Sequence, residues 1–319
     1  MTAPEQDGRD ARSLPRPVSR PRGSGEPAGP GHTASPAPYC QRNKTADNPS
    51  AVGSGRRVTG ARVAEIARDL SERDRAIVAD VGRVRVLTGR QVERLHFAEL
   101  SGRHRDRTRR RVLERLVGLE LLTPLERRVG GHRAGSAGLV FALGPAGQRL
   151  LAIQDNGTEG RIRRPGTPTP RFMIHNLAVA ELYVSLVEAA RTGAFTLTGF
   201  RAEPACWWRT SEDVWVKPDA SVVMAAGDIE DHWNVEVDQA TESLPTMRRK
   251  LKVYLDLVAG GERGPDGGEL PRVLVTVPDE GRLGAVREVV RGLPGPAEEL
   301  FAVVPEGRAV PHIREVLRE

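Results

Sequence analysis

Apolar and polar positions alternate with helical spacing in three stretches of the first half of the chain. These stretches span residues 71–81, 88–97 and 106–119, and each predicts an amphipathic helix. The second begins with Thr88-Gly89-Arg90-Gln91, which has the form of a capping box. The third has an apolar stripe made of Val112, Leu113, Leu116 and Leu119.

Two strand-like runs follow the third helix. Residues 121–129 and 138–143 are rich in apolar residues, and the glycine-rich basic segment 130–136 joins them. Three helices followed by a basic hairpin predict a winged helix-turn-helix over residues 59–151. In that arrangement the third helix docks in the major groove of duplex DNA, and the hairpin loop reaches the neighbouring backbone or minor groove.

A second set of elements starts at residue 172 and predicts a second domain over residues 171–319. A strong amphipathic helix opens it, and strands and helices then alternate. The order predicts a mixed sheet flanked by helices, so the fold class of the whole chain is α+β. The expected helices are 172–190, 245–258 and 281–291, and the expected strands are 195–200, 215–225, 233–238, 272–277 and 300–304.

Two segments contain too few bulky apolar residues to form a core. Residues 1–58 alternate Pro, Gly, Ser and Arg and predict a disordered, mildly basic tail, with a nonspecific DNA-tethering arm as the alternative. Residues 152–170 read as a linker between the two domains.

Composition adds bounds on the environment of the protein. The 319 residues suffice for two domains and a tail, and 39 % hydrophobic residues support packed cores. The two cysteines, Cys40 and Cys206, indicate no disulfide framework and fit a reducing compartment. We find no apolar run near the ~18 residues of a membrane helix and no secretory signal, so we expect a cytoplasmic protein without membrane contact.

The net charge of +6 is unevenly distributed. Residues 71–133 contain 16 basic and 9 acidic residues, a net +7, whereas residues 134–319 contain 21 and 26, a net −5. A basic module followed by an acidic one fits double-stranded DNA as a partner. The alternative is a protein-interaction scaffold with a solvated charged face. The side chains expected to contact DNA are Arg107, Thr108, Arg110, Arg111, Arg115, Arg128, His132 and Arg133.

The strand at residues 233–238 carries the most informative acidic pattern. Trp233, Val235 and Val237 alternate with polar residues, so Glu236 and Asp238 are expected to share the opposite face, roughly 7 Å apart. A third carboxylate, Asp219, opens the preceding strand. Carboxylates this close either hold a divalent cation or lie beside a cationic side chain.

The acidic pattern resembles that of PD-(D/E)xK nucleases, which implies a restriction-endonuclease-like domain. The resemblance assigns Asp219, Glu236 and Asp238 as ligands of Mg²⁺ and as catalytic residues, but Asp238 stands where that family has lysine. Lys250, on the following helix, is one replacement, and a site without lysine formed by Asp238 and Gln239 is another. In the third alternative, the acids form a structural ion network with Arg248, Arg249 or Lys250.

Two further sites have competing interpretations. His175 is expected to be a helix-capping or core residue, with a metal-bound or phosphate-facing role as the alternative. Trp207 and Trp208 are expected to cover the edge of a core, with base stacking as the alternative.

Taken together, the two domains resemble the replication-relaxation family of plasmids and mobile elements. That resemblance implies a DNA-binding accessory protein in replication, relaxation or transfer, with a Mg²⁺-dependent nuclease or nickase and a recruitment module for a relaxase or replication initiator as alternatives. The residues that carry it are Arg73-Asp74, Leu87-Thr88, Arg109 to Leu122, His175-Asn176, Pro218-Asp219-Ala220, Glu236-Val237-Asp238, Thr241-Glu242-Ser243, Lys250-Leu251 and Tyr254.

Overall fold

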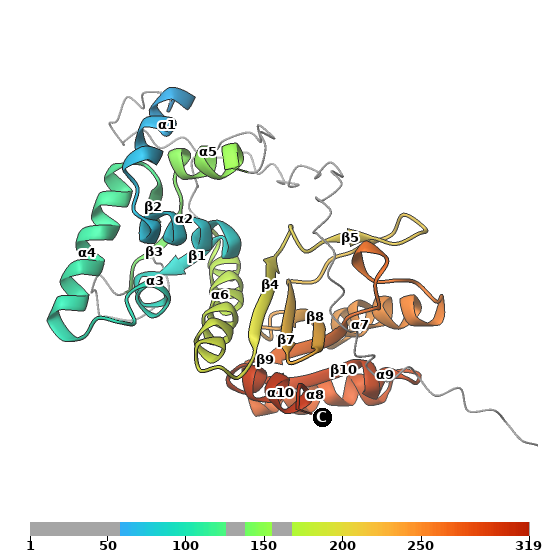
Figure 1. Ribbon diagram of the computed structural model, residues 1–319. Helices are drawn as coiled ribbons and strands as arrows, with labels where there is room; N and C mark the ends of the chain where they lie inside the picture. The colour runs from blue at the N-terminus through green and yellow to red at the C-terminus, as the bar shows by residue number, and fades with distance from the viewer. Residues whose placement is uncertain (1–57, 126–137, 155–167, 319) are drawn as a thin grey trace, which may run out of the picture.

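The computed structural model describes residues 58–125, 138–154 and 168–318 (Figure 1). The described part of the chain forms an N-terminal unit of short helices around a small sheet and a C-terminal unit built on a larger sheet. Helices and strands are both well represented, as the α+β prediction requires. The predicted tail, the loop of the predicted hairpin and most of the predicted linker lie outside the described residues.

The N-terminal unit contains three strands and five helices within the described residues. The strands form an antiparallel sheet in the order β1-β3-β2, with β1 and β2 each paired to β3. The elements are α1 (Gly60–Asp69), α2 (Glu72–Val84), β1 (Val86–Thr88), α3 (Gly89–His96), α4 (Gly102–Gly118), β2 (Leu122–Leu125), β3 (Val140–Leu143) and α5 (Pro145–Gln154).

Local sequence signals set several of these helix ends. The predicted capping box is confirmed at α3, where the Gln91 N–H donates to Thr88 Oγ1 at 3.1 Å and the Thr88 N–H donates to Gln91 Oε1 at 2.9 Å. Ser71 and Asp74 form a second capping box at α2. The helix predicted from residue 106 begins earlier, at Gly102, and the sequence patterns missed α1 and α5.

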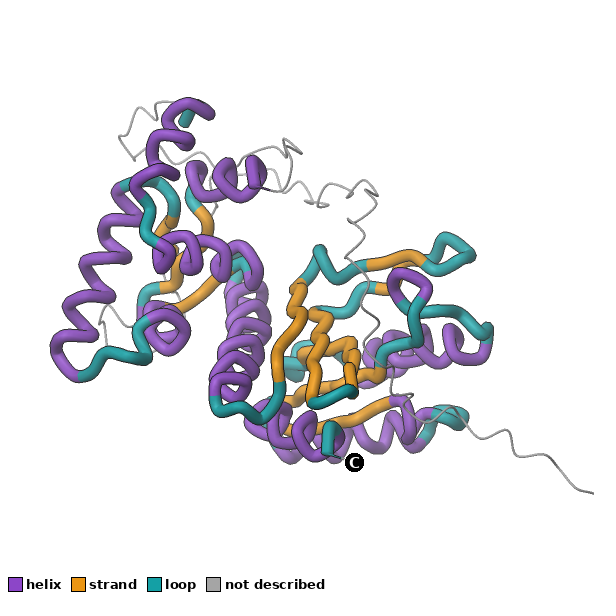
Figure 2. The backbone as a smooth tube through the Cα atoms, in the orientation of Figure 1, coloured by secondary structure: helices purple, strands orange, loops and turns teal. Residues whose placement is uncertain are grey.

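The C-terminal unit has a mixed five-stranded sheet in the order β10-β9-β8-β7-β4. Strands β8, β9 and β10 are parallel to one another, and β7 is antiparallel to both β8 and β4. Figure 2 shows these strands together in the middle of the unit with helices beside them. The elements are α6 (Pro170–Arg191), β4 (Thr196–Ala202), β5 (Trp208–Arg209), β6 (Trp215–Val216), β7 (Ala220–Ala226), β8 (Ile229–Val237), α7 (Leu244–Ala259), η2 (Pro265–Gly267), β9 (Arg272–Val277), α8 (Glu280–Arg291), α9 (Ala297–Leu300), β10 (Phe301–Pro305), η3 (Glu306–Arg308) and α10 (Ala309–Val316).

The predicted order of helices and strands in this unit is confirmed for the predicted elements, but the sequence patterns missed β5, α9 and α10. The single strand expected over residues 215–225 is interrupted, because Lys217-Pro218-Asp219 separates β6 from β7. Residues 233–237 of β8 are buried on both faces, not on one, because α6 and α10 pack on the face that carries Trp233 and α7 packs on the face that carries Glu236. Trp233 and Val235 face the core as predicted, but Glu236 on the other face is also only 1 % exposed.

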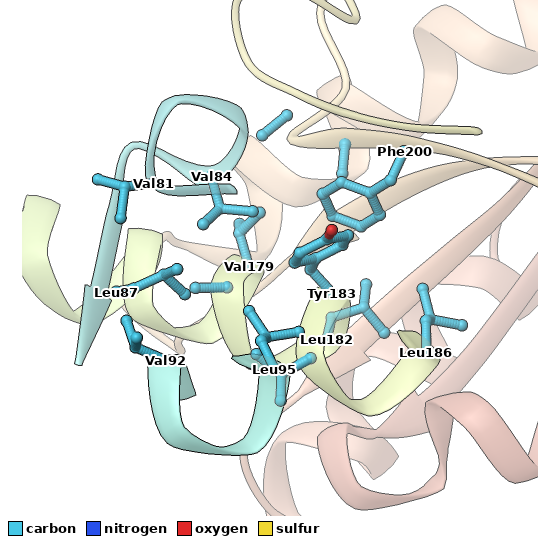
Figure 3. Packing of buried hydrophobic residues seen from close by; sticks show 14 of the residues in the cluster. Val81, Val84, Leu87, Val92, Leu95, Val179, Leu182, Tyr183, Leu186 and Phe200 are labelled. Atoms are coloured by element: carbon cyan, nitrogen blue, oxygen red, sulfur yellow. The ribbon is translucent and has the colours of Figure 1, made fainter. Parts of the chain in front are cut away.

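One apolar cluster joins the two units. It includes Leu87 and Leu95 from the N-terminal unit and Leu182, Leu186 and Phe200 from the C-terminal unit. Figure 3 shows α6 presenting its side chains to both groups. Helix α6 therefore belongs to both cores, and the units do not pack as separate bodies.

The 22 residues of α6 correct the expectation that no segment approaches the length of a membrane helix. By length and hydropathy this helix is apolar enough to cross a membrane. Val179, Val184 and Leu186 are each at most 2 % exposed, because the sheet, α2 and α3 cover them. The apolar composition of α6 is thus explained by burial on two sides.

The shared core predicts that damage in one unit destabilises the other. Replacing the fully buried Leu87 by Ala should lower the free energy of unfolding by about 2–5 kcal/mol. All four tryptophans lie in the C-terminal unit, so their fluorescence reports on that unit alone. In urea unfolding, Leu87→Ala should lower the midpoint seen by tryptophan fluorescence. The exposed Ile153→Ala is the control, and a fluorescence midpoint unchanged in Leu87→Ala would contradict a shared core.

Candidate functional site

A polar pocket lies where β7 begins and β8 ends. Its volume is about 330 Å³. Helices α6 and α7 contribute the facing wall. The ionisable side chains that line it are Arg171, His175, Glu203, Asp219, Glu236, Asp238, Glu242 and Lys250.

Asp219 is held by both backbone and side-chain donors. Its Oδ2 accepts the Val237 N–H at 2.7 Å, and its own N–H donates to Val235 O at 2.9 Å, so it is fixed to strand β8. The Lys250 Nζ lies 3.6 Å from Oδ2. Burial by itself would raise the pKa of Asp219, but the hydrogen bond from His175 and the Lys250 charge outweigh it and hold the pKa below its usual value.

Glu236 is the most deeply buried acid of the pocket. Its Oε1 accepts a hydrogen bond from the Tyr254 hydroxyl at 2.5 Å, and its Oε2 forms an ion pair with Lys250. Burial raises the pKa of Glu236 to about 8, although the Lys250 charge acts in the opposite direction. The same burial, together with the Glu236 charge, raises the pKa of Tyr254 well above its usual value.

Lys250 reaches back from the second turn of α7 to both acids. Its ammonium contacts Glu236 and Asp219, so the structure brings together three of the four residues predicted as catalytic. Burial lowers the pKa of Lys250, but the two carboxylates raise it by more, and the net shift is upward. The side chain remains 31 % exposed on the pocket side, which leaves ammonium hydrogens accessible to an anion.

Asp238, the fourth predicted residue, has its carboxylate engaged elsewhere. Its Oδ2 accepts from Arg282 Nε at 2.5 Å, and its Oδ1 accepts the Ala240 N–H at 2.9 Å. Arg282, on α8, also donates to the Glu242 carbonyl at 2.8 Å. Asp238 lines the pocket, but it forms an ion pair with the protein itself.

His175 lies closer to the site than the sequence predicts. A helix-capping or core role is expected there, whereas its Nε2 lies 3.4 Å from Asp219 Oδ1. The hydrogen bond to Asp219 raises the pKa of His175, and burial opposes this only in part. The pocket therefore holds the His175 imidazole and the Lys250 ammonium beside the two oxygens of one carboxylate.

The donor set bears on whether the pocket suits a metal ion. Within residues 58–125, 138–154 and 168–318, no group of three or more His, Cys, Asp or Glu side chains is arranged to hold one. Asp219 and Glu236 supply two carboxylates, which suffices for Mg²⁺ only when water and substrate oxygens complete its shell. The Lys250 ammonium lies against both acids, so a cation would take its place between them.

Helix α4 forms a second charged feature, and its arginines fall into two groups. The first group faces inward or sideways and is paired. Arg109 is buried against Glu93, and Arg105 lies 3.1 Å from the same carboxylate. Arg115, predicted to contact DNA, pairs at 2.5 Å with the buried Asp74. Burial would raise the pKa of Asp74, but hydrogen bonds from Arg115 and Ser71 lower it by more.

The second group forms the outer face of α4. Arg103, Arg107, Arg110 and Arg111 are exposed, and the side chain of none of them forms an ion pair or hydrogen bond with any part of the chain that the structure describes. Their spacing of three and four residues places them on one side of the helix. Thr108 is half-buried beside them. The remaining predicted contacts, Arg128, His132 and Arg133, lie outside the described residues.

Arg85 joins the N-terminal unit to the pocket, and the sequence patterns missed it. Its NH1 lies 2.9 Å from Glu203 Oε1, and its guanidinium carbon lies 4.7 Å from the centre of the Phe172 ring. It also ends α2 with φ of 70°, a left-handed conformation that costs a non-glycine residue energy. A positive φ at an arginine cannot be inferred from hydrophobic periodicity.

The buried acid of the pocket predicts a pH-dependent stability. The ordinary pKa of Glu236 is 4.5 and its pKa in the folded protein is about 8. The stability that protonated Glu236 contributes is therefore fully present below pH 4.5 and is lost as the pH rises through 8. The pKa of His175 is also raised, so the stability that protonated His175 contributes is likewise lost as the pH rises above its ordinary pKa of 6.5. Asp219, whose pKa is lowered from 3.8, acts in the opposite direction but only at lower pH.

In metal-free buffer, the free energy of unfolding should therefore fall by on the order of 1 kcal/mol or more between about pH 5 and pH 8. Glu236→Gln should flatten this slope. Glu242→Gln, a half-buried carboxylate of the same pocket, is the matched control. Urea unfolding across that range measures the slope. Stability that rises with pH, or a slope unaffected by Glu236→Gln, would contradict the assignment.

Comparison with known proteins places these features in a family. No match was found among curated proteins or among solved structures. The family model described as replication-relaxation matches residues 78–273. The match starts within α2, includes α4 and the pocket residues Asp219, Glu236 and Lys250, ends in β9, and covers more than half of the 319 residues. The chain therefore belongs to the replication-relaxation family.

Proposed function

We propose that this protein is a DNA-binding accessory protein of a plasmid or other mobile element, acting in replication, relaxation or transfer. Membership of the replication-relaxation family supports that role. The duplex would be held by the outer face of α4. The observation that carries the proposal is a set of exposed arginines on that face whose side chains have no acidic partner among the described residues, whereas the arginines of α4 that face inward or sideways are neutralised by acids of the protein.

The topology of the N-terminal unit supports a winged helix-turn-helix. Helix α2, strand β1, helices α3 and α4 and the antiparallel strands β2 and β3 occur in the order that this motif uses, and β1 pairs with β3. In such a unit α4 is the recognition helix. The connection between β2 and β3, which contains Arg128, His132 and Arg133, would then reach the neighbouring DNA backbone.

Unpaired arginines on one helix face are suited to phosphate. Each contact with a DNA phosphate releases a condensed counterion, and that release supplies most of nonspecific affinity. Arginines already paired with Glu93 or Asp74 would gain less, because binding would break an existing ion pair. Arg107, Arg110 and Arg111, which pair with no acid in the described part of the chain, are thus expected to carry most of the salt-dependent affinity.

Replacing Arg107, Arg110 and Arg111 together by Ala should weaken duplex affinity strongly. The slope of log K against log salt should flatten by about 0.9 for every phosphate that the variant no longer neutralises. Fluorescence anisotropy of a labelled duplex at several salt concentrations measures both quantities. A triple Ala variant at Arg263, Arg291 and Arg308 removes the same charge from exposed positions of the C-terminal unit and serves as the control. Equal affinities and slopes for the two variants would reject α4 as the DNA-binding helix.

The pocket favours a second candidate function, a Mg²⁺-dependent DNA nuclease or nickase on a restriction-endonuclease-like unit. The specific observation is the convergence of Asp219, Glu236 and Lys250 from three elements. Asp219 and Glu236 would hold the ion, which when bound would lower the pKa of a coordinated water and offset phosphate charge. Lys250, moved from between the acids, would donate to a phosphate oxygen.

Incubation of supercoiled plasmid with the protein and Mg²⁺ or Mn²⁺ tests this second candidate. The wild-type protein should produce nicked circles, and Asp219→Ala and Glu236→Ala should each abolish nicking. Asp256→Ala, which removes an exposed acid paired with Lys252 on the same α7, should retain it. If the wild-type protein produces no nicks with either metal, the nuclease candidate is rejected and the DNA-binding proposal stands unaffected.

A further inference from the structure

The chain between β4 and β7 forms a small two-stranded ribbon, β5 and β6 (β5 is labelled in Figure 1). It carries three of the four tryptophans of the chain, Trp207, Trp208 and Trp215. The ring of Trp208 packs against the apolar cluster formed by α7, α8 and β9. Trp208 therefore has the core-covering role expected from the sequence.

Trp207 and Trp215 have different surroundings. Both are half-buried, and neither packs against an apolar cluster of the residues that the structure describes. Cations cover them instead. The Lys217 Nζ lies 5.0 Å from the centre of the Trp207 ring and 6.0 Å from that of Trp215, and the Arg209 guanidinium carbon lies 4.6 Å from that of Trp215.

Lys217 is the cation of this group that no acid of the described residues neutralises. Arg209 forms an ion pair with Asp213, whereas Lys217 is exposed and has no acidic partner among residues 58–125, 138–154 and 168–318. A lysine resting on an indole ring keeps its ammonium hydrogens free for a second partner. Its position suits an anion such as a phosphate.

The ribbon is anchored directly to the acidic pocket. Lys217 precedes Asp219 by two residues, and Cys206 Sγ donates to the Pro218 carbonyl at 3.1 Å, which ties the start of the ribbon to its end. Glu203, just before the ribbon, lines the pocket. A ligand that extends along the ribbon from Lys217 would therefore approach Asp219 and Glu236.

We propose that the β5–β6 ribbon binds single-stranded DNA, with bases stacked on Trp207 and Trp215 and a phosphate held by Lys217. Alternating aromatic rings and free cations are the chemistry by which proteins bind unpaired strands. A duplex is a poor ligand for these rings, because its base faces are already stacked. This single-strand site is separate from the proposed duplex-binding face of α4 and does not depend on that face.

Binding of a labelled oligothymidylate of about 15 nucleotides, measured by anisotropy, tests the site. Trp207→Leu and Trp215→Leu should each weaken binding about fivefold or more, the lower end expected when one base no longer stacks on an aromatic ring. Trp207→Phe should retain more affinity than Trp207→Leu. Lys217→Gln should flatten the salt slope by about 0.7, the value for one phosphate of a single strand.

Three controls keep this outcome separate from that of the duplex-binding proposal. Lys252→Gln removes an exposed lysine that is already paired with Asp256 and should bind like the wild-type protein. The triple Ala variant of Arg107, Arg110 and Arg111 should lose duplex affinity and keep oligothymidylate affinity. Oligouridylate of the same length should bind no tighter than oligothymidylate. The proposal would be overturned if the wild-type protein does not bind oligothymidylate, if the ribbon variants bind it as well as Lys252→Gln does, or if oligouridylate binds more tightly than oligothymidylate.

Discussion

The two-sided burial of α6 is the constraint on which the rest of this structure depends. Its side chains complete the core of the N-terminal unit and cover one face of the C-terminal sheet. Polar contacts strengthen the same junction, since Arg94 on α3 pairs with Glu181 and Glu188 on α6. The pKa of Glu188 is lowered by its hydrogen bond from Arg94, as expected for a carboxylate stabilised in its charged form. The basic helix and the acidic pocket are therefore held in one fixed relation.

Pairing separates the structural charges of this protein from those available to a ligand. Arg109 and Arg282 are mostly buried, and each neutralises an acid of the same chain. The outer arginines of α4 and Lys217 of the ribbon have no such partner among the described residues. In the pocket, Lys250 has an intermediate position, because it pairs with two acids yet remains partly exposed. An incoming phosphate would compete with no ion pair of the described residues at the outer arginines of α4 or at Lys217. At Lys250 it would compete with Asp219 and Glu236.

Much of the fold follows from local patterns, whereas much of the site does not. The capping box of α3, the helix α6 and the order of the strands along the chain rest on short-range spacing, which sequence reports directly. Lys250 could be predicted as a partner of Glu236 because only one loop and the first turns of α7 separate the two residues along the chain. The pairing of Asp238 with Arg282 depends instead on the packing of α8, 44 residues along the chain, and His175 meets Asp219 only because α6 crosses the sheet. Periodicity contains no information on such long-range side-chain contacts.

We propose that the protein meets duplex DNA at the outer face of α4. Photo-cross-linking to a duplex that carries an aryl diazirine on thymine C5, followed by mass spectrometry of the cross-linked peptides, tests this contact. We expect cross-links within residues 102–118, the span of α4. Cross-links confined to the helices of the C-terminal unit, with α4 unmodified, would contradict it.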